Sequence, residues 1–232
     1  MTSTLASRAA ALALACSTGA CSPTGPLGPP SESFRAGPAT QEEVESLQTF
    51  LRMQTSPIEL RVIDTWDGLG ATYEMNAILA RVGDRMSGQT VCKRGGLRLT
   101  VTLNVAASQI DAIVTGVTTI PVLRDRYRPR IEHTDDYPLR ALGWSAGHYV
   151  WLYSESQGRD HTPWAIVTGE RESNRALAVS TAQAHNAVEA LRPLVGFDRC
   201  AAFNEACPGY YTSIDAAPAA CRALAPTVDN GS

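Results

Sequence analysis

The segment from residue 97 to residue 105 restricts the possible folds of this chain more than any other. Leucine or valine occupies every second position, and the positions between them carry Arg98, Thr100, Thr102 and Asn104. This alternation places apolar side chains on one face of a β-strand and polar side chains on the other. We therefore predict a half-buried strand in a sheet with one face against the core and one face toward water.

Neighbouring segments carry further strand and helix patterns. Strands are predicted at 58–65, 71–82, 89–92, 149–153, 164–167 and 176–179, with turns at Gly83-Asp84 and Ser87-Gly88. Helices are predicted at 41–51, where Thr40 and Glu43 form a capping box, from Ser108 onward, and at 181–194. Short turns join sequential strands, so we expect an α+β fold. It has an antiparallel sheet of about five to seven strands packed by two or three helices, without internal repeats.

The N-terminus has the parts of a secretory signal. Arg8 supplies a positive charge, residues 9–15 are only alanine and leucine, and small residues then precede a cysteine. The apolar run is much shorter than the roughly 20 residues that span a bilayer. We therefore expect export, with residues 1–20 removed as a signal peptide.

Two cysteines compete as the processing point of this signal. Cys16 follows Leu14-Ala15 and Cys21 follows Gly19-Ala20, and both sites resemble the bacterial lipoprotein signal, whose cysteine becomes the lipidated N-terminus. Neither site has the leucine usual three positions earlier. Residues 21–39 are rich in proline and glycine and are interpreted as a spacer, and residues 40–232 as one globular domain. The resemblance implies a lipid anchor in the periplasm or at the cell surface; ordinary secretion is the alternative.

The chain has six cysteines, and their parity bears on the anchor. If Cys21 is lipidated, an even number remains for two disulfides in an oxidising compartment. These four are Cys92, Cys200, Cys207 and Cys221. Spacing leaves three connectivities open, and we favour one that joins Cys92 to the C-terminal segment. A zinc site is not expected, because no C-x-x-C motif is present.

Residues 143–147 read Gly-Trp-Ser-Ala-Gly and match G-x-S-x-G, the nucleophile elbow of serine hydrolases. The resemblance implies Ser145 as nucleophile, His161 or His185 as base, and Asp160 or Asp198 as acid. In that family the serine stands between a strand and a helix, whereas strand patterns flank this motif on both sides. The hairpin interpretation is therefore preferred, and a secreted serine hydrolase is the alternative function.

Residues 124–136 carry candidate ligand-binding side chains. Four arginines alternate at Arg124, Arg126, Arg128 and Arg130, so an extended segment would present them together to an anion. The acids Glu132, Asp135 and Asp136 follow and offer internal partners instead. Together with His133 they could hold a divalent ion, but no spacing is diagnostic, and we predict no metal or cofactor. The net charge of −3 argues against nucleic-acid binding.

Aromatic residues concentrate in one predicted hairpin, at Trp144, Tyr149, Trp151, Tyr153 and Trp164. Strand parity puts 149, 151 and 153 on one face and 150 and 152 on the other. The aromatic face either packs under a helix or forms a platform for a protein or glycan partner. We therefore expect a non-catalytic binding or scaffolding domain in an exported, lipid-anchored cell-envelope protein.

Overall fold

A computed structural model describes residues 37–68, 71–126, 139–155, 164–168, 175–207 and 213–228. The predicted signal peptide, both candidate lipidation sites (Cys16 and Cys21) and most of the predicted spacer lie outside these ranges. Among the described residues, no helix has the length and apolar character needed to cross a bilayer.

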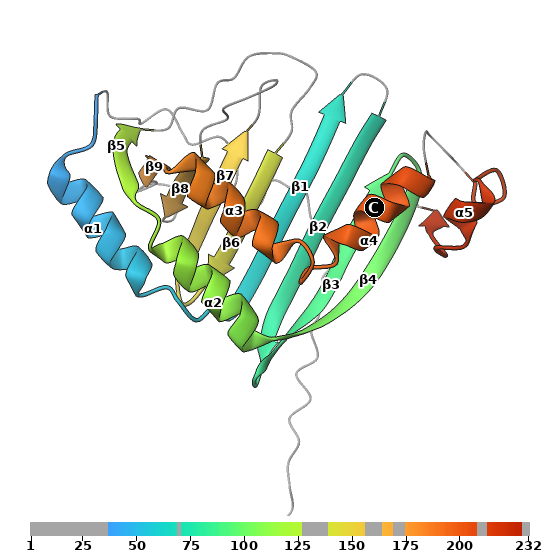
Figure 1. Ribbon diagram of the computed structural model, residues 1–232, viewed down its shortest axis with the longest axis horizontal. Helices are drawn as coiled ribbons and strands as arrows, with labels where there is room; N and C mark the ends of the chain where they lie inside the picture. Colours follow the sequence, from blue (N-terminus) through green and yellow to red (C-terminus); the bar gives the residue numbers. More distant parts are fainter. Residues whose placement is uncertain are drawn as a thin grey trace, which may run out of the picture.

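The fold is α+β, built on one antiparallel sheet with the strand order β10-β4-β3-β2-β1-β6-β7-β8-β9-β5. Helices pack along one side of this sheet (Figure 1). The strands are β1 (Glu59–Gly68), β2 (Ala71–Val82), β3 (Arg85–Arg94), β4 (Leu97–Ala106), β5 (Val122–Arg126), β6 (Leu139–Ser145), β7 (Tyr149–Glu155), β8 (Trp164–Thr168), β9 (Arg175–Val179) and β10 (Thr227–Val228). The helices are α1 (Gln41–Arg52), α2 (Ala107–Thr118), α3 (Thr181–Leu191), α4 (Phe197–Ala206) and α5 (Ala219–Arg222).

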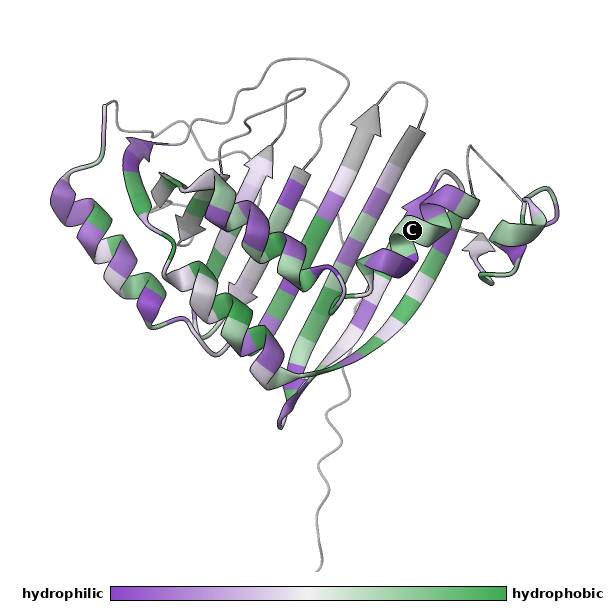
Figure 2. Cartoon of the chain, in the orientation of Figure 1, coloured by the Kyte–Doolittle hydropathy of each residue, from purple (hydrophilic) through white to green (hydrophobic). Residues whose placement is uncertain are grey.

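The alternation predicted for residues 97–105 is confirmed in β4. Its leucines and Val101 are buried toward the helices, while Thr100, Thr102 and Asn104 are exposed on the opposite face. Figure 2 shows the resulting bands of hydrophobic and hydrophilic residues along the strand. The core thus forms between the apolar face of the sheet and the helices that cover it.

Local hydrogen bonds determine where α1 and α2 begin. Thr40 caps α1, because its hydroxyl accepts from the Glu43 N–H and the Glu43 carboxylate accepts from the Thr40 N–H. The predicted cap at Ser108 is wrong. The helix α2 begins at Ala107 without a side-chain cap, since the Ala107 N–H donates to the Asp84 carbonyl instead.

The sheet contains two units of the same topology, which the sequence did not reveal. Strands β1 to β4 followed by α2 form one unit, and β6 to β9 followed by α3 form the other. The strand order is symmetric about the β1–β6 pair, and α2 and α3 pack against each other. Their buried positions also correspond: Ile110, Val114 and Val117 in α2 have the same spacing as Ala184, Val188 and Leu191 in α3. A pseudo-two-fold axis therefore passes between β1 and β6.

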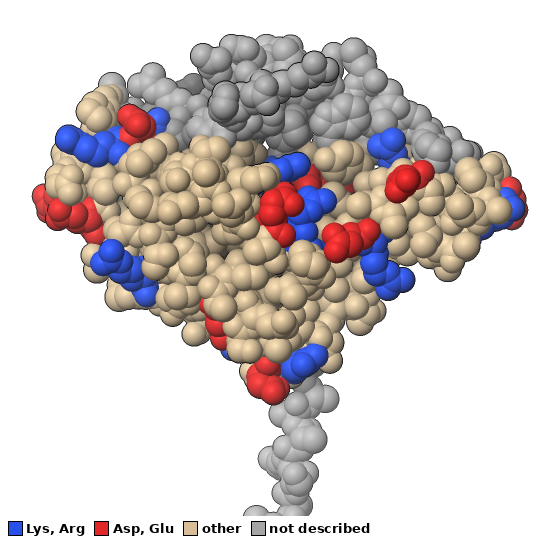
Figure 3. Space-filling view, viewed as in Figure 1, with Lys and Arg blue, Asp and Glu red and all other residues tan. Residues whose placement is uncertain are grey.

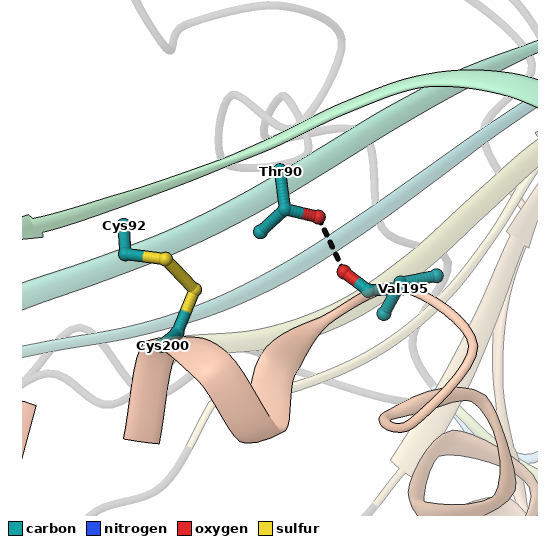
Figure 4. The surroundings of a disulfide bond; sticks show 4 residues. All are labelled: Thr90, Cys92, Val195 and Cys200. Atoms are coloured by element: carbon teal, nitrogen blue, oxygen red, sulfur yellow. Dashed lines mark hydrogen bonds between the residues drawn. A yellow bond between two sulfur atoms is a disulfide. The ribbon is translucent and has the colours of Figure 1, made fainter. Parts of the chain in front are cut away.

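Two disulfides tie the C-terminal segment, and the preferred link from Cys92 to that segment is confirmed. Cys92 in β3 bonds to Cys200 in α4, and Cys207 bonds to Cys221 in α5. Beside the first bridge, the Thr90 hydroxyl donates to the Val195 carbonyl just before α4 (Figure 4). All four cysteines are fully buried.

The expected numbers of strands and helices were too low. Ser87-Gly88, predicted as a turn, lies inside β3, where a Cβ on Gly88 would come within 1.9 Å of the Ile78 carbonyl oxygen. Glycine therefore marks a close approach of two backbones here, not a turn. Strands β5 and β10 and helices α4 and α5 were not predicted at all.

Candidate binding face

The sheet face opposite the helices is called the back face here. Parity assigns residues to it: in β6 and β7, Leu142, Trp144, Val150 and Leu152 join the core under the helices, so their neighbours point the other way. In the described part of the chain, no helix packs on the back face. Its side chains are therefore the ones that the core does not use.

Cross-strand pairing builds the centre of the back face from aromatic and small residues. Trp151 pairs with Gly143 in β6, and Tyr153 pairs with Ala141 on one side and Ala165 on the other. The indole ring lies over Gly143 so closely that a Cβ there would be 2.4 Å from it. The small neighbours leave room for two large rings side by side.

The burial of the aromatic residues differs from both predicted alternatives. Trp151 and Tyr153 are each only 5% exposed, although no described helix covers them, whereas Tyr149 is 49% exposed. Trp151 Nε1 is buried without a hydrogen-bond acceptor. Buried indole N–H groups usually find a partner, so this donor is an exception.

An exposed apolar side chain and a half-buried charged side chain continue the back face toward β2. Ile78 is 51% exposed and pairs with Arg61, which in turn pairs with Gly143 under the Trp151 ring. One row of the sheet thus carries an aliphatic side chain, a guanidinium group and an indole ring. In the next row, the Tyr149 hydroxyl donates to the Glu59 carboxylate. That hydrogen bond is the main reason why the pKa of Tyr149 is raised above 10.0.

Ser145 lies on the back face at the end of β6, between Glu59 and Tyr149 in the register. The motif around it forms a hairpin turn, in which Gly147 has a φ of +107°. His185 is exposed on α3, on the other side of the sheet, so the structure does not bring these two residues together. His161 lies outside the described residues, and the hydrolase therefore stays a prediction.

Two of the four alternating arginines are described, and both have internal partners. Arg126 donates to both carboxylate oxygens of Glu43, at 2.9 and 3.0 Å, and Arg124 Nε donates to the Ala39 carbonyl at 3.0 Å. Arg128 and Arg130, together with Glu132, His133, Asp135 and Asp136, lie outside the described residues. Among the residues described, no group of three or more histidine, cysteine or acidic side chains could hold a metal.

A charged cluster on the helix side was not predicted from the sequence. Asp64 in β1 is 4% exposed, and its carboxylate lies 2.8 Å from Arg192 Nη1 at the end of α3 and 3.7 Å from Arg140 Nε in β6. Glu189 contacts both guanidinium groups, so the cluster is balanced in charge. Figure 3 shows acidic and basic side chains next to each other in the middle of the helix-covered face, with further charged groups toward its rim. Burial, and then the negative charge of Asp64, raise the pKa of the adjacent Tyr73.

This cluster is explained by its role in joining α3 to the sheet. The only sign in the sequence was Asp64, an acid on the apolar face of its strand, and its partners are distant in the chain. A buried carboxylate with two guanidinium partners and one tyrosine hydroxyl satisfies its own charge and hydrogen-bonding capacity.

Comparisons with protein-family models, with curated proteins and with solved structures found no match to this chain.

Proposed function

We propose that this chain is an exported, lipid-anchored cell-envelope protein whose folded part binds a protein or glycan partner through the back face. The disulfides are consistent with an extracellular or periplasmic location. Disulfides persist in such compartments and are rare in a reducing cytosol. The lipid anchor rests on the N-terminal sequence alone.

The exposed Ile78, the half-buried Arg61 beside it and, in the next row, the exposed Tyr149 carry the binding part of the proposal. Ile78 is half exposed in the middle of a strand, where a single-sided sheet ordinarily places a polar side chain. Arginine and aromatic residues are enriched where proteins bind partners, and aromatic rings also stack on sugars. These side chains are close together because the pairing register of four neighbouring strands puts them there.

Photocrosslinking in the producing cell tests this proposal. A photoreactive phenylalanine analogue at Ile78 is expected to form a discrete adduct on irradiation, because a bound partner covers that position. Sensitivity of the adduct to protease or to glycosidase then distinguishes a protein partner from a glycan.

Gln183 provides the matched control, since it is exposed on α3 on the helix side of the sheet. The same analogue at Gln183 is expected to give no discrete adduct. Equal crosslinking from both positions, or none from Ile78, contradicts a binding role for the back face.

A further inference from the structure

The two outer edges of the sheet differ, although the pseudo-two-fold axis makes them equivalent. One row of buried residues crosses both units: Val101, Thr90, Ala77, Val62, Leu142, Leu152, Ile166 and Leu177. At the Leu177 end the row continues into β5, where Arg126 is the partner. At the Val101 end it stops at the outer edge of β4.

The strand β5 shows what the symmetry would place beside β4. It follows α2 of the first unit and pairs antiparallel with β9, the last strand of the second unit. The equivalent segment after α3 would pair with β4. The chain instead forms α4 there, and the described residue pairs beside the outer edge of β4 are those of β10 with Leu97 and Arg98. Within the described residues, positions 99–106 thus have a strand on their β3 side only.

The direction of the backbone groups on this edge follows from one hydrogen bond. The Ala107 N–H donates to the Asp84 carbonyl, on the β3 side. Successive residues of a strand alternate in direction, and the register between β3 and β4 is unbroken. The N–H and C=O groups of Thr100, Thr102 and Asn104 therefore point outward, and Arg85 already reaches the Asn104 carbonyl.

Among the described residues, this edge has few of the features that ordinarily prevent strands from pairing, although the Arg85 guanidinium reaches it at the Asn104 carbonyl. Residues 99–106 contain no proline and no charged side chain, and their register with β3 shows no bulge. The other edge has these features: β5 carries Arg124, Asp125 and Arg126 and has a register shift. The Ala39 N–H also donates to the Arg124 carbonyl there, at 2.7 Å.

We propose that the β4 edge pairs with the β4 edge of a second copy of this chain, forming an antiparallel dimer with a continuous sheet. In a register centred on Thr102, Thr102 faces its own counterpart, Thr100 faces Asn104, and Val101 faces Leu103. Apolar residues meet apolar residues on the helix side, and uncharged polar residues meet on the back face. Paired positions then run from 99 to 105, which leaves Leu97 and Arg98 to β10 in both copies.

Sedimentation velocity of the full chain over a range of concentrations tests the dimer. Thr102→Pro removes an outward N–H but no hydrogen bond to β3, so it should leave the fold intact. We expect the wild-type chain to dimerise and Thr102→Pro to raise the dimer dissociation constant at least about tenfold. Thr102→Ser, which keeps the N–H and the hydroxyl, should dimerise like the wild type. A wild-type chain that stays monomeric, or an unchanged Thr102→Pro dimer, overturns the proposal.

Hydrogen exchange of the wild-type chain gives a second test that does not depend on any variant folding. The amides of Thr100 and Thr102 should become more protected as the protein concentration rises, while amides on the β5 edge should not change. Protection that is independent of concentration, or that appears only when an unrelated extended peptide is added, contradicts pairing between copies.

Discussion

At the residue scale, Gly143 is required by the Trp151 ring that lies over it. Replacing it with alanine would place a Cβ 2.4 Å from the ring. We predict that Gly143→Ala lowers the free energy of unfolding by about 1–3 kcal/mol, as overpacked sites do. Denaturant unfolding of the purified chain measures the change.

Gly116 supplies the control for this substitution. It is exposed in α2, and a Cβ there would meet nothing within 4 Å. Gly116→Ala should therefore leave stability unchanged or raise it by roughly 0.5–1 kcal/mol, because alanine favours the helix. Equal effects of the two alanines would show that the close contact with Trp151 is not what requires Gly143.

Glu43 makes stability depend on pH in the acid range. The Thr40 N–H, and next the Arg126 guanidinium, lower the pKa of this carboxyl from 4.5 to about 2. The pKa of Glu43 is lower in the folded chain than in the unfolded chain. Its stabilisation of the fold is therefore complete above about pH 4.5 and is lost as the pH falls toward 2. The melting temperature of the wild type should exceed that of Glu43→Gln near neutral pH, and this difference should shrink across that range. A comparable pH dependence for Glu42→Gln, which removes the same charge from the same turn, would contradict this account.

At the element scale, the disulfide between β3 and α4 should contribute more than the one near the C-terminus. Cys92 and Cys200 are 108 residues apart, whereas Cys207 and Cys221 are 14 apart. A disulfide that closes a loop of roughly 100 residues in the unfolded chain is expected to stabilise the fold by about 4.7 kcal/mol through loop-closure entropy. For a loop of roughly 15 residues the expected stabilisation is about 3 kcal/mol. We expect the Cys92→Ala, Cys200→Ala pair to destabilise the chain more than the Cys207→Ala, Cys221→Ala pair in denaturant unfolding. The reverse order would show that the links do not act mainly through the unfolded chain.

The helices and strands that could be predicted are those whose own residue pattern is enough to identify them. Strands β2 and β4 and helix α1 have regular alternation or a capping box, and they lie where they were expected. Helix α4 was missed because its buried side chains are Phe197, Cys200 and Phe203, a short set among alanines and near a proline. Its position depends on the link to Cys92, which no local pattern contains. Strand β5 was missed because it has no alternation of apolar and polar residues: Arg124, Asp125 and Arg126 are consecutive, and only Val122 is buried.

At the scale of the whole molecule, equivalent positions of the two units are buried alike but are not occupied by the same residues. Equivalent positions hold different residues, such as Thr90 and Ile166 in the row that crosses the sheet, so a sequence repeat is not visible. Parity correctly placed Tyr149, Trp151 and Tyr153 on one face. It could not say which face the helices cover, because that depends on contacts between segments distant in the chain. The back face could therefore be recognised as a candidate site only from the assembled sheet.

Mass spectrometry of the mature N-terminus, taken from cell membranes, tests the central claim most directly. The account predicts a chain that begins at a lipid-modified Cys21 or Cys16, with the preceding residues removed. An unmodified chain that retains Met1, or a processed chain without lipid in the soluble fraction, would contradict the anchor.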